Sequence, residues 1–194
     1  NVDNTLDLAV TIPNTGGGAG SVLILLGDPL NPGSFLSGAQ IPVGVDPSSV
    51  AAGLLNADAF VDLVVANAGD DDVTILFGVG DGTFNAAGDL ATGPDPSAVA
   101  IGNLDGNALG DVLVTNENVG GLNGTLTIIF DAGTGPFADA LFLNAPVGSS
   151  PGTVCPADVD MDRMGDAVVA NAGSGNISIL RNLGNRVFAQ QTVF

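Results

Sequence analysis

The sequence contains no histidine, and it has a single cysteine, Cys155. Without histidine the chain lacks the commonest general base, the usual zinc ligand and any Ser-His-Asp triad, which excludes most hydrolytic enzyme templates. One cysteine cannot form a disulfide within the chain. Because Cys155 takes the place of Ala51 and Ala100 in internal repeats, we expect a small core residue rather than a reactive thiol.

Basic residues are also scarce. The chain has three arginines and no lysine against 21 acidic residues, which gives a formal net charge of −18. Nucleic acids and anionic lipids bind through clustered lysine and arginine, so neither is expected as a partner. All the acidic residues except Glu117 are aspartates. Short, rigid carboxylates suit turns and loops that bind hard cations.

Long apolar runs are absent. The run at 22–26 is far shorter than the ~20 residues a helix needs to cross a bilayer, so we expect no membrane insertion. No signal peptide precedes the first residues, which already resemble the inside of a repeat. We therefore expect the chain to be part of a longer protein, with its targeting signal outside this window.

An internal repeat is the strongest feature that is present. Four times an aspartate opens a short, apolar run that closes on asparagine, at intervals of 55, 49 and 55 residues: Asp7, Asp62, Asp111 and Asp166. Other landmarks keep the same period, namely Pro47, Pro96 and Pro151 before the aspartates and Phe35, Phe84, Phe137 and Phe188 after them. We therefore predict one repeat domain, 1–194, with repeats at about 1–45, 46–94, 95–149 and 150–194.

Each repeat is expected to form four antiparallel strands. In the second repeat these strands follow Pro47, then cover 63–66, 73–77 and 84–91, with polar or glycine-rich turns between them. The first repeat starts late and so lacks its first strand. Four-stranded units of ~50 residues predict an all-β fold, a β-propeller of four-stranded blades, rather than a sandwich, a β-helix or a helical repeat.

Several motifs in fixed order resemble the FG-GAP and VCBS repeats of extracellular proteins and the related propeller of integrin α subunits. They are Pro-x-x-Val-Ala at Pro47 and Pro96, the sequence Asp-Leu-Val-Val-Ala-Asn from Asp62, and Phe-Gly-Val-Gly-Asp-Gly-Thr-Phe over 77–84. The resemblance spans the whole chain. It implies calcium loops of the form D-x-D-x-D-G-x-x-D between the first two strands of each blade.

The repeats match that loop to different degrees. Calcium takes six to eight oxygen ligands, and alternate residues of a tight loop supply them. The fourth repeat offers the fullest set: Asp158, Asp160, Asp162, the Met164 carbonyl and Asp166. The third offers Asn103, Asp105, Asn107, the Leu109 carbonyl and Asp111. The second offers Asn56, Asp58, the Phe60 carbonyl and Asp62 but has Leu54 at position 1, and the first retains Asn1, Asp3 and Asp7.

The loops depart from the family at position 6. The expected glycine is replaced by Asn4, Ala59, Ala108 and Arg163. If that position must be left-handed, a residue with a Cβ costs about 1–2 kcal/mol, which would lower calcium affinity. An EF-hand at Asp158 is excluded because its twelfth position is Val169 rather than Glu. The alternative for each loop is an Asx turn that satisfies its own backbone without metal.

Two further motifs stay open at the sequence level. The sequons at Asn123 and Asn176 are candidates for N-glycosylation, although Asn123-Gly is also a hairpin signal. The acidic run 70–72 is expected to be a solvated turn rather than a second cation site.

The leading functional hypothesis is a non-enzymatic, calcium-stabilised extracellular propeller, secreted or on a cell surface, for adhesion, assembly or ligand presentation. Its partners would be an extracellular protein, a carbohydrate or copies of itself. One alternative is a protomer that polymerises into an extracellular fibre through incomplete blades at its two ends, because missing strands leave free edges. A second is a carbohydrate-active enzyme using paired carboxylates.

Overall fold

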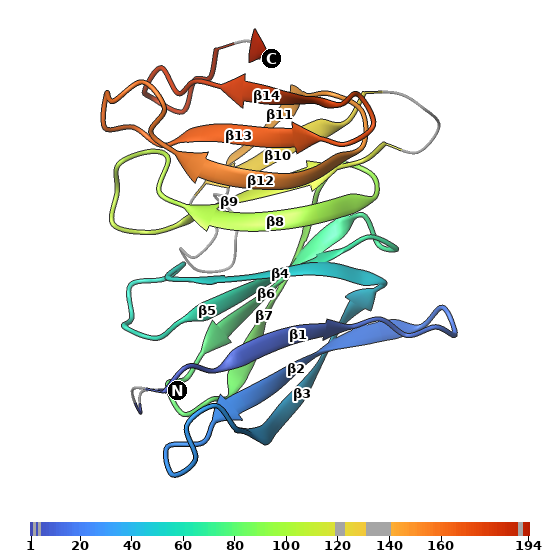
Figure 1. Ribbon diagram of the computed structural model, residues 1–194, viewed down its shortest axis with the longest axis vertical. Helices are drawn as coiled ribbons and strands as arrows, with labels where there is room; N and C mark the ends of the chain where they lie inside the picture. The colour runs from blue at the N-terminus through green and yellow to red at the C-terminus, as the bar shows by residue number, and fades with distance from the viewer. Residues whose placement is uncertain (2, 4, 119–122, 131–140, 190–191) are drawn as a thin grey trace.

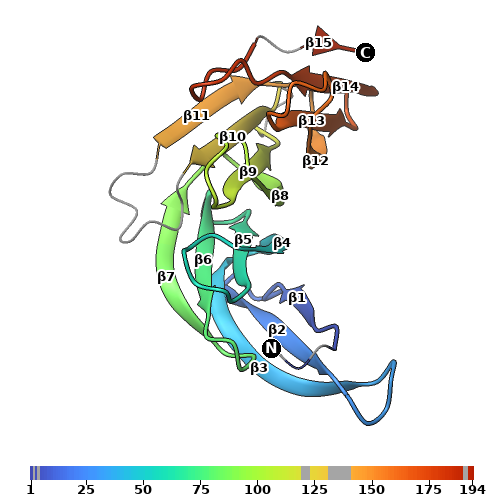
Figure 2. The same cartoon turned by 90° about the vertical axis from the view of Figure 1, so that its left-hand side faces the viewer.

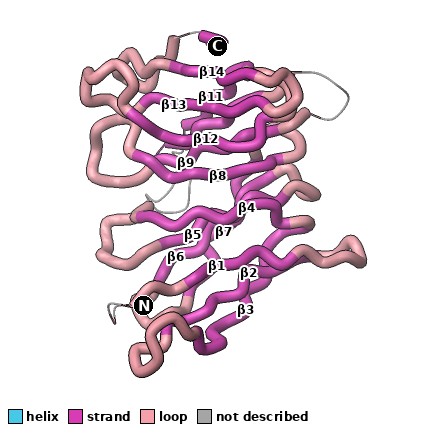
Figure 3. Tube along the Cα trace, viewed as in Figure 1, coloured by secondary structure: helices cyan, strands magenta, loops and turns pink. Residues whose placement is uncertain are grey.

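The computed structural model describes residues 1, 3, 5–118, 123–130, 141–189 and 192–194, and the described part is all-β without helix (Figure 3). The side chains of 141 and 142 are not described. Phe137 and Asn4 lie outside the described residues. The predicted all-β, antiparallel architecture is confirmed.

The strands form four antiparallel sheets in chain order. Sheet 1 contains three strands: β1 (Leu8–Ile12), β2 (Ala19–Gly27) and β3 (Phe35–Val45). Sheet 2 contains β4 (Pro47–Gly53), β5 (Asp62–Asn67), β6 (Asp72–Gly78) and β7 (Phe84–Ala91). Sheet 3 contains β8 (Pro96–Gly102), β9 (Asp111–Asn116), β10 (Thr125–Phe130) and β11 (Leu141–Pro146). Sheet 4 contains β12 (Pro151–Ala157), β13 (Asp166–Asn171), β14 (Asn176–Leu180) and β15 (Thr192–Val193).

The sheets stack one after another in a curved row, with sheet 1 at one end and sheet 4 at the other (Figures 1 and 2). Strands β4, β8 and β12 line the concave side, and β3, β7 and β11 lie on the convex side (Figure 2). In sheet 1 the concave side is occupied by β1, which corresponds to β5 in sheet 2. The strand that would precede β1 is the one that the first repeat lacks.

Three apolar clusters fill the spaces between neighbouring sheets. A sheet inside the row is covered on both faces, so its central strands need no polar side. All six residues of β5 and all six of β9 are accordingly buried. This explains why these strands are continuous apolar runs rather than alternating ones.

Small residues on the concave strands let neighbouring sheets approach closely. A Cβ added at Gly53 would lie 2.8 Å from Cγ2 of Ile101 in β8, and one added at Gly102 would lie 2.5 Å from Cβ of Pro156 in β12. Larger side chains there would push the sheets apart. None of the described segments is a helix of the length and apolarity that crossing a membrane requires.

The prediction for Cys155 was wrong. Its counterparts Ala51 and Ala100 pack against the apolar clusters that join their sheets to the next sheet. Cys155 is exposed, because within the part of the chain that the structure describes no further sheet packs on that face of sheet 4.

Candidate metal centre

In sheets 2, 3 and 4 the recurring aspartate begins the second strand and is a buried hydrogen-bond acceptor. Asp62 is 0% exposed. Its Oδ2 accepts the N–H of Leu55 at 2.8 Å, in the loop after β4, and its Oδ1 accepts the N–H of Gly78 at 3.0 Å, at the end of β6. One carboxylate therefore ties the first, second and third strands of a sheet together.

Asp166 repeats this arrangement in full, and Asp111 and Asp7 each repeat one of its two bonds. Asp166 accepts the N–H groups of Val159 and Asn182, both at 2.8 Å. Asp111 accepts that of Leu104 at 2.7 Å, and Asp7 accepts that of Gly27 at 2.8 Å. The period in the sequence thus marks a structural acceptor, whatever else the aspartate binds.

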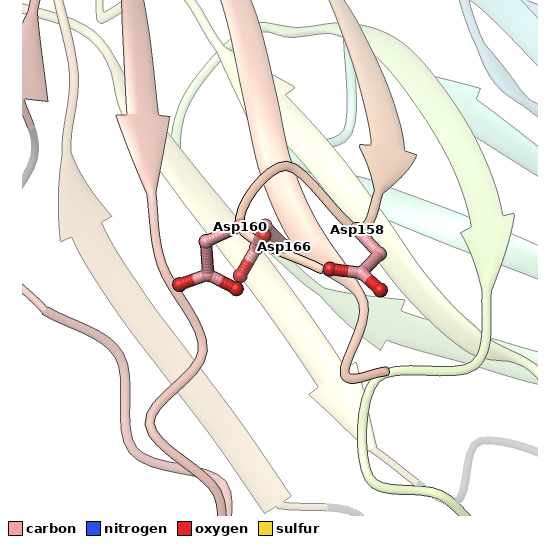
Figure 4. A group of neighbouring side chains, drawn as sticks. All are labelled: Asp158, Asp160 and Asp166. Carbon is pink, nitrogen blue, oxygen red and sulfur yellow. The ribbon is translucent and has the colours of Figure 1, made fainter. Parts of the chain in front are cut away.

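The loop between β12 and β13 brings three carboxylates together. One oxygen from each of Asp158, Asp160 and Asp166 lies within 4.8 Å of the other two. Asp158 and Asp160 are exposed, whereas Asp166 is buried. Figure 4 shows the three side chains around the same short loop.

This donor set fits a hard divalent cation. Calcium binds oxygens at about 2.3–2.6 Å, so two ligands on opposite sides of one ion are at most about 5 Å apart. The 4.8 Å limit on the three oxygens satisfies that condition. Asp158, Asp160 and Asp166 would hold the ion, and the remaining sites would take carbonyl or water oxygens.

Asp162, also predicted as a ligand, is not in this group. Its Oδ1 accepts the N–H of Met164 at 2.8 Å, as in an Asx turn. The carboxylate of Asp158 accepts the N–H groups of Asp162 at 3.1 Å and Arg163 at 2.9 Å, which fixes the loop around it. Arg163 has a φ of 73°, so position 6 of this loop is left-handed despite its Cβ.

The loop between β8 and β9 binds a positively charged side chain from another part of the chain. Arg186, from the segment between β14 and β15, donates to Oδ2 of Asp105 through Nη2 at 2.7 Å and Nε at 3.1 Å. The side chain of Asp105 is 8% exposed. The amide oxygens of Asn103 and Asn107 accept the N–H groups of Gly106 at 2.8 Å and Leu109 at 2.6 Å.

The guanidinium of Arg186 therefore already neutralises the one carboxylate at the third position of this loop. The left-handed residue here is Gly106, with a φ of 79°, and not Ala108. The ligand geometry predicted for the third repeat is thus replaced in part by an ion pair between sheets 3 and 4.

The remaining two loops form Asx turns. In the second repeat Asn56 accepts the N–H of Asp58, and Asp58 accepts that of Phe60, both at 2.8 Å. Near the start of the chain Asn1 accepts the N–H of Asp3 at 3.1 Å. Hydrogen bonds from the hydroxyl and N–H of Thr5 hold the pKa of Asp3 below its ordinary value.

Asp70 and Asp71 lie in the turn between β5 and β6, and Asp72 begins β6. The side chains of Asp70 and Asp71 bind the segments that connect neighbouring sheets. Asp70 accepts the N–H of Val45 at 2.7 Å, and Asp71 accepts that of Asp95 at 2.8 Å. Burial, together with the neighbouring charges of Asp89, Asp70 and Asp71, raises the pKa of Asp72. These contacts match a turn rather than a second cation loop.

The two sequons lie at turns between strands. The carbonyl of Asn123 accepts a hydrogen bond from the side chain of Asn118 at 2.9 Å. Asn176 begins β14, and its amide oxygen accepts from Asn171 at 2.9 Å and Ser174 at 3.0 Å. Glycosylation of either residue stays a prediction.

Sequence reasoning missed the two arginines that reach the acidic loops. Arg181 lies 3.7 Å from Asp160, and Arg186 binds Asp105 although 81 residues separate them. Only their rarity was a signal, since the chain has three basic residues in all.

Comparison with known proteins finds no match: no family model matches the chain, and no curated protein does.

Proposed function

We propose that the chain is a non-enzymatic, calcium-stabilised extracellular module of β-propeller type that serves adhesion, assembly or ligand presentation. The observation that carries the calcium part is the group formed by Asp158, Asp160 and Asp166. Because this loop joins β12 to β13, an ion held there would link the first two strands of sheet 4. The resemblance to FG-GAP and VCBS repeats supports an extracellular setting, where calcium is abundant.

The propeller assignment is supported by the stacking of repeated antiparallel sheets in a curved row (Figure 2). In a propeller, blades pack face to face around an axis with their first strands innermost. Strands β4, β8 and β12 lie on the concave side and carry small residues such as Gly53 and Gly102, which supports their being the innermost strands.

The role is proposed as non-enzymatic because several acids of the repeat loops are already engaged by the fold. Asp62 and Asp166 each accept backbone N–H groups through both oxygens, and Asp105 binds Arg186. A carbohydrate-active enzyme is the weaker alternative, since it needs carboxyl groups free to exchange protons with a substrate.

A second candidate function is the protomer of an extracellular assembly, and exposure at sheet 1 favours it. Three apolar residues of β1 are exposed, Leu8 by 44%, Val10 by 41% and Ile12 by 36%. One edge of β1 has no partner strand among the described residues. Such an edge with exposed apolar side chains is suited to contact with another chain.

Calcium titration by calorimetry tests the proposed function. We expect binding to the whole chain, lost in Asp160→Asn and retained in Asp58→Asn, which alters an exposed acid of the second loop. Equal binding by both variants, or no binding by the unaltered chain, would remove the basis for the proposal.

A further inference from the structure

Neighbouring sheets of this chain pack face to face three times. The sheets at the two ends of the row each expose one of the two kinds of face that meet in these contacts. Each inner sheet has a leading face, which packs on the preceding sheet, and a trailing face, which packs on the following sheet. In sheet 2 the leading face contains Leu63, Val65 and Leu76, and the trailing face contains Val64, Ala66, Val73 and Ile75. All seven of these residues are at most 3% exposed.

No sheet among the described residues packs on the leading face of sheet 1. The strand register identifies its residues, because Leu8 pairs with Leu25 as Leu63 pairs with Leu76. Leu8 is 44% exposed where Leu63 is 3% exposed. Val10, two residues along β1, is 41% exposed where Val65 is fully buried. Apolar residues therefore occupy this face without cover.

The trailing face of sheet 4 is the complementary case. Ala170 pairs with Ile177 as Ala66 pairs with Val73, so Ile177 occupies the place of Val73. Ile177 is 38% exposed, whereas Val73 is 0% exposed. Exposed Cys155 belongs to the same face, because its counterpart Ala51 packs toward sheet 3.

We propose that the trailing face of sheet 4 in one copy packs on the leading face of sheet 1 in a second copy, head to tail. The second copy is the occupant because the two exposed faces are the two sides of the interface that already joins sheets 1 to 2, 2 to 3 and 3 to 4. A heterologous contact of this kind gives a ring when its rotation closes and a filament when it does not. The inference rests on the assembly role within the proposed function, but it does not require calcium.

This end contact is weaker than the internal ones. Within the chain, the hydroxyl of Ser48 donates to the carbonyl of Pro96 at 2.6 Å, and that of Ser97 donates to the carbonyl of Pro151 at 2.5 Å. Gly152 stands at the serine position in sheet 4, and no described strand precedes β1 to carry the acceptor. The net charge of −18 adds repulsion between copies. Association is therefore reversible, and salt strengthens it by screening that repulsion.

Sedimentation of the whole chain over a dilution series, at low and high salt, measures this association. We expect mass to increase with concentration, more steeply at high salt. Val10→Asp and Ile177→Asp each abolish the increase, since each blocks one face. An equimolar mixture of the two variants restores a one-to-one dimer, because each variant keeps the face that the other has lost. Leu30→Asp, at an 86% exposed loop position, is the control and associates like the unaltered chain.

Cys155 supplies a second measurement that needs no substitution. The alkylation rate of its thiol should fall as the chain associates, because the trailing face becomes covered. A chain that stays monomeric at every concentration and salt level overturns the proposal and leaves further repeats of a longer protein as the occupant. Association that survives both face variants, or that leaves Cys155 equally reactive, also overturns it.

The same series with a calcium chelator separates this inference from the calcium proposal. Asp160→Asn should lose calcium binding and still associate, whereas Val10→Asp should bind calcium and remain monomeric. Failure of either proposal is therefore visible without reference to the other.

Discussion

Arg186, between β14 and β15 of sheet 4, donates two hydrogen bonds to a single carboxylate oxygen of Asp105, from Nη2 at 2.7 Å and from Nε at 3.1 Å. Its guanidinium carbon also lies 5.1 Å from the ring centre of Phe130. Sheets 3 and 4 are thereby joined by an ion pair and a cation–π contact in addition to their apolar cluster. A protein cation thus binds the central acid of the loop in sheet 3, whereas the corresponding loop of sheet 4 has three acids together.

Replacing this arginine should destabilise the fold measurably. Arg186→Gln leaves the carboxylate of Asp105 buried without its cation, at a cost of about 1–3 kcal/mol in unfolding free energy. Arg181→Gln is the matched control, because Arg181 is 53% exposed and 3.7 Å from Asp160. Its loss should cost at most about 0.5 kcal/mol. Urea unfolding of both variants measures the difference, and equal stabilities would contradict the role given to Arg186.

The recurring aspartate should matter for stability even where no metal binds. Asp62→Asn replaces an acceptor oxygen by an amide donor that must face a backbone N–H, either that of Leu55 or that of Gly78. We expect a loss of about 2–4 kcal/mol. Asp58→Asn keeps the oxygen that accepts from Phe60 and should change stability by less than about 0.5 kcal/mol. Chemical unfolding in the presence of a chelator checks both, and a tolerated Asp62→Asn would show that the carboxylate is not a structural acceptor.

The close approach of Gly44 and Asn67 gives a test of the connections between sheets. A Cβ added at Gly44 would lie 2.6 Å from Cγ of Asn67, which is buried at the end of β5. Gly44→Ala should cost about 1–3 kcal/mol through overpacking. At Gly152 a Cβ would meet nothing within 4 Å, so Gly152→Ala is the matched control. Thermal unfolding should separate the two alanine variants, and identical melting would refute the tight packing.

The raised pKa of Asp72 predicts the direction in which folding stability changes with pH. Its pKa in the fold is raised above the ordinary value of 3.8, by burial first and then by neighbouring acids. The contribution of such a carboxyl to stability is complete below the ordinary pKa and is lost as pH rises through the raised pKa. Asp72→Asn should therefore be more stable than the unaltered chain at neutral pH, on the order of 0.5 kcal/mol. The stability advantage of Asp72→Asn should shrink as the pH falls through the raised pKa of Asp72 toward 3.8.

Asp81→Asn is the control of opposite sign. Hydrogen bonds from the hydroxyl and N–H of Thr83 lower the pKa of Asp81, so its contribution is present above the ordinary pKa and lost as pH falls. This variant should be less stable at neutral pH. Urea unfolding of the two variants at several pH values measures both trends, and trends of the same sign would contradict the assignment.

The sequence was sufficient to predict the strands and their grouping. The stacking of similar sheets produces both the repeat period in the sequence and the buried apolar strands. Residues such as Val64 and Val65 lie between two sheets, so the repeat appears as continuous apolar runs that begin at a buried aspartate. The missing strand of the first repeat was visible for the same reason. The propeller prediction implied that the sheets follow a curve, but the repeat period alone could not set how strongly the row curves, since that depends on packing among all the sheets.

The candidate site was predictable only within single loops. Spacing placed Asp158, Asp160 and Asp166 in one loop, but it could not show that Asp162 would bond the N–H of Met164 instead of joining them. The pairing of Arg186 with Asp105 joins residues 81 positions apart and leaves no local pattern. Cys155 was misassigned because alignment with Ala51 and Ala100 treats every sheet as an inner one.

Thermal unfolding with and without calcium tests the central claim most directly, namely that an ion at the β12–β13 loop stabilises the fold. An ion that binds the folded state alone raises the melting temperature as its concentration increases. We predict that a strong chelator lowers the melting temperature of the unaltered chain and of Asp58→Asn, and that Asp160→Asn loses most of this dependence. Equal melting temperatures of the unaltered chain in calcium and in chelator would contradict the account.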